Sequence, residues 1–113
     1  FSDRISFIND ENQVVKTFEC SSGSGPDGLS FDAQGRLYVA MAFKGQIEQF
    51  SLSGDSQLLY KLDPEVNYPG GPKGIFDCAV RSENSTIAFS SACLDEEYAK
   101  INNTSSITIA TLH

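Results

Sequence analysis

Short runs in which apolar and polar residues alternate constrain this chain more than any other feature of its sequence. An alternation with period two places every second side chain on one face of a β-strand, whereas an amphipathic helix needs a period near 3.6. Clusters rich in Gly, Pro, Asn and Asp separate the runs and favour turns. The sequence therefore predicts an all-β fold, with strands at residues 5–8, 14–18, 29–31, 37–41, 47–52, 58–62, 78–80, 87–90 and 107–112.

The strand pattern also repeats along the chain. Phe31 and Val80 are 49 residues apart, and Leu37 and Ile87 are 50 residues apart. An interval near 50 is typical of the four-stranded blades of β-propellers. Counted in this way, the chain contains two outer strands of one blade at residues 1–20, a complete blade at 26–63, and three strands of a closing blade at 74–113.

Two partial sheets and one complete sheet cannot close a ring. Repeat units of this kind bury their apolar faces only against neighbouring units, and an open face would expose apolar surface. Where the ends of a closed propeller meet, the last blade takes its missing strand from the distant N-terminal region. We therefore expect residues 1–113 to be the C-terminal portion of a single propeller domain, completed by an N-terminal portion on the same or a separate chain.

The charge balance argues against two classes of partner. Eight basic residues against fifteen acidic ones give a net charge of −7. Nucleic acids and anionic membranes attract patches of Lys and Arg, so we expect neither as a partner. No run approaches the roughly 20 consecutive apolar residues that a membrane-spanning helix requires.

Cysteines and glycosylation signals indicate an oxidising compartment. The candidates for a disulfide are Cys20, Cys78 and Cys93. This odd number allows one disulfide with one remaining thiol, or a bond to a partner chain. Sequons for N-linked glycosylation begin at Asn84, Asn102 and Asn103. Together these features favour a secreted glycoprotein.

One segment of sixteen residues carries most of the chemical information, namely GPDGLSFDAQGRLYVA at residues 25–40. It resembles the signature PDG-hydrophobic-x-hydrophobic-D-x-x-G-x-L-(W/Y)-V-A of the gluconolactonase / regucalcin (senescence marker protein) family. Residues 45–50 and 78–92 are similar to a third strand and to the closing blade of that family. The resemblance implies that the chain forms about two blades plus a half blade of a six-bladed β-propeller.

The motif singles out Asp27 as the candidate site residue. Pro26 fixes its own φ and disfavours helix at the residue before it, and Gly28 removes side-chain bulk as the strand begins. A carboxylate held there, near the axis of the ring and facing others from neighbouring blades, suits a hard divalent cation. By the resemblance, Asp27 matches the aspartate that binds the metal and also serves as general base. The alternative is that Asp27 only caps a turn.

The function that the resemblance implies is metal-dependent hydrolysis of a lactone, such as a sugar lactone, by a propeller enzyme. The cofactor would be one divalent ion, Ca²⁺ before Zn²⁺ or Mn²⁺, which polarises the carbonyl while a carboxylate assists the attacking water. The family's other metal ligands fall outside this sequence. Two alternatives remain open: a non-catalytic propeller that binds a ligand or partner protein, and a strictosidine-synthase-like enzyme without a catalytic metal.

Other polar residues near the motif are expected to be structural. Asp32 should accept hydrogen bonds from turn amides, and Gly35 should adopt a positive φ in the same turn. Asp77 is a candidate second acid at the start of the next inner strand, but it lies one position off the equivalent of Asp27. Aromatic residues spaced for the core are Tyr38, Phe50 and Tyr60.

Overall fold

A computed structural model describes residues 3–62, 73–81, 86–93 and 106–111. The strands are Arg4–Ile8 (β1), Val14–Glu19 (β2), Pro26–Phe31 (β3), Leu37–Met41 (β4), Gln46–Phe50 (β5), Ser56–Lys61 (β6), Lys73–Arg81 (β7), Thr86–Cys93 (β8) and Ser106–Thr111 (β9). A short 3-10 helix, Ala42–Lys44 (η1), joins β4 to β5. The all-β prediction is confirmed, although β7 and β8 are longer than the sequence predicts and η1 is not predicted.

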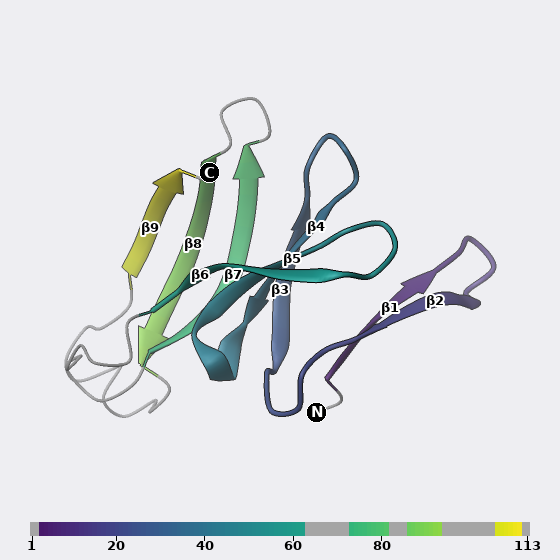
Figure 1. Cartoon of the computed structure of the whole chain (residues 1–113), viewed down its shortest axis with the longest axis horizontal. Helices are drawn as coiled ribbons and strands as arrows, with labels where there is room; N and C mark the ends of the chain where they lie inside the picture. The colour runs from purple at the N-terminus through teal and green to yellow at the C-terminus, as the bar shows by residue number, and fades with distance from the viewer. Residues whose placement is uncertain (1–2, 63–72, 82–85, 94–105, 112–113) are drawn as a thin grey trace.

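The strands form three antiparallel sheets, each of which pairs strands in the order of the chain. We name them the first sheet (β1–β2), the central sheet (β3–β4–β5–β6) and the third sheet (β7–β8–β9). The three sheets lie side by side in chain order, with the central sheet between the other two (Figure 1). No helix within the described ranges is long and apolar enough to cross a membrane.

The strand pairing reproduces the predicted repeat. Phe31 pairs with Leu37 next to the connection between the first two strands of the central sheet. In the third sheet, Val80 on the first strand pairs with Ile87 on the second strand. Residues that the sequence places 49 or 50 positions apart therefore occupy equivalent places in two successive sheets, as expected of repeated structural units.

Strand β4 is buried along its whole length because sheets cover both of its faces. Side chains on a strand alternate between the two faces, so a strand covered on both sides is apolar throughout. Tyr38 and Ala40 belong to the core shared with the third sheet, while Leu37 and Val39 belong to the core shared with the first. This double burial explains the uninterrupted run LYVAM.

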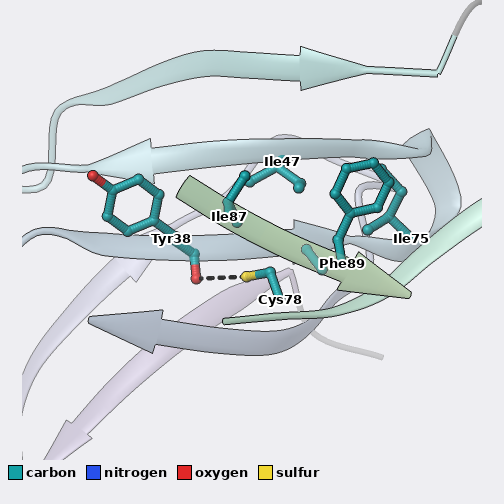
Figure 2. Close-up of a cluster of buried hydrophobic side chains, with 7 residues drawn as sticks. Tyr38, Ile47, Ile75, Cys78, Ile87 and Phe89 are labelled. Atoms are coloured by element: carbon teal, nitrogen blue, oxygen red, sulfur yellow. Dashed lines mark hydrogen bonds between the residues drawn. The ribbon is translucent and has the colours of Figure 1, made fainter. Parts of the chain in front are cut away.

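The central and third sheets enclose the first of two apolar clusters (Figure 2). Its members are Tyr38, Ala40, Ile47, Ile75, Cys78, Ile87 and Phe89. The ring of Tyr60 packs on the ring of Phe89 with centroids 5.0 Å apart, and the Cys78 thiol donates a hydrogen bond to the Tyr38 carbonyl at 3.4 Å. Burying one isoleucine or phenylalanine side chain, as in this cluster, stabilises a fold by about 1.5–3 kcal/mol.

The first and central sheets enclose the second cluster. Ile5 and Phe18 pack there against buried side chains of β4 and β5. The rings of Phe18 and Phe50 stack with centroids 5.6 Å apart and planes 12° apart. The Lys16 ammonium lies 5.2 Å from the Phe18 ring centroid and donates a hydrogen bond to the carbonyl of Leu52 in the turn between β5 and β6. The three aromatic residues predicted for the core are confirmed: Tyr38 and Phe50 are buried and Tyr60 is partly buried.

Asp32 organises the turn between β3 and β4 as predicted. Its Oδ1 accepts the backbone N–H groups of Gln34 and Arg36, each at 2.9 Å, and Gly35 has a φ of 82°. Its Oδ2 accepts a hydrogen bond from Nε of the Arg36 guanidinium at 2.6 Å and another from the Tyr38 hydroxyl at 2.9 Å. Burial alone would raise the pKa of Asp32, but these hydrogen bonds lower it overall.

Replacing Asp32 with Asn should therefore lower the free energy of unfolding by about 1–3 kcal/mol, because an amide cannot accept all four hydrogen bonds. The pKa of Asp32 lies below its ordinary value of 3.8, so the carboxylate stabilises the fold fully above that pH and loses this effect as the pH falls through the lowered pKa. In denaturant titrations between neutral and acidic pH, the free energy of unfolding should fall less with decreasing pH in the variant than in the parent protein. An unchanged pH profile would contradict this role.

Two apolar surfaces of the described structure are open. On β3, Leu29 is 46% exposed and Phe31 is 52% exposed. Leu29 pairs with Val39 and Phe31 pairs with Leu37. Both side chains therefore lie on the face of the central sheet that the first sheet covers at β4 and β5. On β9, the exposed isoleucines are Ile107 at 80% and Ile109 at 72%. Exposed large apolar side chains grouped in this way are typical of contact surfaces, whereas singly exposed ones are not.

Candidate functional site

Asp27 lies in β3, the first strand of the central sheet, with its side chain exposed. Within the described part of the chain, its carboxylate makes no hydrogen bond and no ion pair. In this it differs from Asp32, whose oxygens are fully engaged in one turn. The carboxylate of Asp27 is thus available to a ligand.

The first strands of the central and third sheets, β3 and β7, each carry an irregularity in their pairing with the next strand, which in β3 falls at Asp27. In β3, Asp27 and Gly28 together oppose the single residue Ala40 of β4. In β7, Phe76 is the additional residue at the corresponding place. An extra residue of this kind changes the direction of the side chains beside it, and such bulges are over-represented next to active sites. The bulge in β3 therefore sets the direction of the Asp27 carboxylate.

Gly28 brings β3 and β7 into close contact. A Cβ atom on Gly28 would lie 2.5 Å from the Cα of Asp77 and would overlap its carboxylate, so only glycine fits at this place. The carboxylate of Asp77 is thereby placed beside the residue that follows Asp27. Asp77 is exposed, and its Oδ1 accepts the N–H of Cys78 at 2.8 Å. The 49-residue interval makes Asp77 the equivalent of Gly28, and Phe76 the equivalent of Asp27.

A loop at residues 21–25 leads into β3 and is held by both neighbouring elements. On one side, the carboxylate of Asp3 accepts the N–H of Gly23 at 2.9 Å and the N–H of Gly25 at 3.0 Å. On the other side, the carbonyl of Gly25 accepts the N–H of Ala42 in η1 at 2.8 Å. Sequence reasoning missed Asp3, because nothing near it in the sequence indicates a contact with a loop some twenty residues away.

Described residues alone do not assemble a complete metal site. No three His, Cys, Asp or Glu side chains of the described ranges come close enough to hold a metal ion together. Carboxylate oxygens are suitable ligands for Ca²⁺, which takes six to eight oxygen atoms. Asp27 therefore fits a calcium site as one donor, and further donors would have to come from other residues.

The described cysteines form no disulfide, and the predicted bond to a partner chain stays a prediction. Cys20 and Cys78 both carry free thiols. Burial raises the pKa of each thiol to about 11, helped at Cys20 by the charge of Glu48 and at Cys78 by that of Asp77. Because the thiolate is the reactive form, both groups are unreactive at neutral pH. The sequon residues Asn84, Asn102 and Asn103 lie outside the described structure, and so does the side chain of Cys93.

Three adjacent antiparallel sheets, two of which repeat at an interval of 49 or 50 residues, define part of a β-propeller. Solved propeller structures are similar to the chain. They include a PQQ-bound aldose sugar dehydrogenase from Streptomyces coelicolor, with a TM-score of 0.61 at 17% identity over 86% of this chain. A virginiamycin B lyase from Staphylococcus aureus has a TM-score of 0.60 at 16% identity over 96% of this chain.

A protein from Lactobacillus plantarum has a TM-score of 0.57 at 15% identity over 98% of this chain. The chain spans 27% of the length of the dehydrogenase, 34% of the lyase and 35% of the Lactobacillus protein. No family model and no curated protein matches the sequence. The likeness to solved structures establishes the fold, which is that of a partial propeller.

Proposed function

We propose that this chain is part of a propeller enzyme that hydrolyses a lactone with one divalent cation, and that Asp27 is its metal-binding and general-base residue. The observation that carries this proposal is the exposed, unengaged carboxylate of Asp27 beside a bulge in the first strand of the central sheet. Support for the chemistry comes from the resemblance of residues 25–40 to the gluconolactonase / regucalcin signature. The structural likeness to propellers supports the ring.

In this proposal the chain supplies one ligand and one base. The bound cation, Ca²⁺ before Zn²⁺ or Mn²⁺, would polarise the lactone carbonyl as a Lewis acid. Asp27 would bind it through one carboxylate oxygen and take the proton of the attacking water. Asp77 lies close enough to the same strand to add negative charge, which favours cation binding.

The remaining ligands would come from the N-terminal portion of the propeller. Leu29 and Phe31 leave the inner half of one face of the central sheet open, and Ile107 and Ile109 leave the face of β9 open. The first surface lies on the central sheet, on the face toward the first sheet, and the second lies on the last strand of the third sheet. We propose that the N-terminal portion covers both and so closes the ring, and that the protein is secreted, as its sequons favour.

Metal analysis of the complete protein tests this function. We expect about one divalent ion per propeller, loss of lactone hydrolysis on chelation with EDTA, and recovery when Ca²⁺ is added back. A lactonase that is active without metal would contradict the role of Asp27. A protein that binds lactones without hydrolysing them would favour the non-catalytic alternative, and a metal-free condensing activity would favour the strictosidine-synthase-like one.

A further inference from the structure

The side chain of Asp3, the residue before the first sheet, reaches the loop that precedes Asp27. It lies directly before β1, where its own carbonyl accepts the N–H of Cys20 at 2.8 Å. Each of its carboxylate oxygens accepts one loop amide, Oδ2 from Gly23 and Oδ1 from Gly25. These backbone hydrogen bonds, that from Gly25 before that from Gly23, lower the pKa of Asp3. Asp3 is thus ionised at neutral pH, and hydrogen bonds to a carboxylate are stronger than neutral ones.

The opposite side of the loop is fixed to η1 of the central sheet. The carbonyls of Ser24 and Gly25 accept the N–H groups of Phe43 and Ala42, at 3.1 Å and 2.8 Å. Gly25 has a φ of 62°, and a Cβ atom there would overlap the Phe43 ring. These contacts fix the conformation of the loop between the first sheet and η1, and the loop ends two residues before Asp27.

We propose that Asp3 is a positioning residue for Asp27. By holding Gly23 and Gly25 from the neighbouring sheet, it fixes the course of the chain into β3 and with it the place of the Asp27 carboxylate. Ligand atoms must lie within a fraction of an ångström of their productive position, so a loosened support weakens binding without removing any ligand. The inference rests on the proposed function of Asp27 as a metal ligand.

Calcium binding to the complete protein, measured by titration calorimetry, tests this role. In Asp3→Ala we expect the dissociation constant to rise about tenfold, the size expected from losing charge-assisted hydrogen bonds. Asp3→Asn keeps one acceptor oxygen and should lose less. Asp10→Ala removes the same charge from the exposed loop between β1 and β2 and should leave the constant unchanged. Circular dichroism confirms that each variant is folded.

Amide hydrogen exchange of residues 21–25 provides a readout that does not depend on the metal. We expect faster exchange in Asp3→Ala than in the parent protein and in Asp10→Ala. Equal losses of calcium affinity in Asp3→Ala and Asp3→Asn would show an effect of charge alone and would overturn the proposal. Faster exchange with unchanged affinity would overturn the positioning role alone. Unchanged affinity in Asp27→Asn would overturn the proposed function together with this inference.

Discussion

Replacing Asp27 with Asn is expected to reduce lactone hydrolysis by the complete protein about a thousandfold or more. General-base catalysis alone contributes roughly 10²–10⁴-fold, and the variant would also lose a charged metal ligand. Because the side chain is exposed and engages no described residue, its replacement should leave the fold unchanged. Initial rates of lactone opening, followed by acid release, measure the effect, and far-ultraviolet circular dichroism checks the β-sheet content.

The matched control for this variant is Asp10→Asn. Asp10 is likewise an exposed aspartate, but it lies in the loop between β1 and β2, away from β3. Its replacement should leave the rate within the error of the measurement, because surface substitutions away from a site have small effects. If Asp27→Asn hydrolyses lactones at the parental rate, Asp27 has only a structural role at the beginning of β3.

Replacing Gly28 with Ala is expected to lower the free energy of unfolding by about 3 kcal/mol or more. Overpacking a close contact usually costs about 1–3 kcal/mol, and here the added methyl group would meet a backbone atom that cannot rotate away. The Cα of Asp77 would lie 2.5 Å from the new Cβ, so β3 and β7 would have to move apart. Far-ultraviolet circular dichroism in a denaturant titration of the complete protein measures this loss.

Two further variants show whether the close approach of the strands is the cause. Gly23→Ala places a methyl group where no atom lies within 4 Å, so its φ of 76° alone should cost about 1–2 kcal/mol. Adding Asp77→Gly to Gly28→Ala removes the carboxylate but leaves the Cα, and should restore only part of the stability. A Gly28→Ala variant no less stable than Gly23→Ala would mean that β3 and β7 do not approach this closely.

Local patterns predicted the features that depend on neighbouring residues. Alternation along each run located the nine strands, and the interval from Phe31 to Val80 matches the observed pairing of two sheets. The turn at Asp32 was predicted down to its amide hydrogen bonds, because an aspartate and a glycine three residues later determine that turn between them. The role of Asp27 as metal ligand and base stays a prediction, drawn from the resemblance of its motif.

Tertiary structure decided which distant segments meet. The contact of Gly28 with Asp77 joins two sheets, and the hydrogen bonds of Asp3 to Gly23 and Gly25 join the residue before β1 to the loop before β3. Periodicity shows which face of a strand is buried but not which neighbour buries it, so neither contact could be predicted from the sequence. The sequence by itself determined the strands, their repeat and their turns, since those depend on side-chain alternation and backbone preferences. Only the packing of sheet against sheet determined what surrounds Asp27, since that depends on distances between residues far apart in the chain.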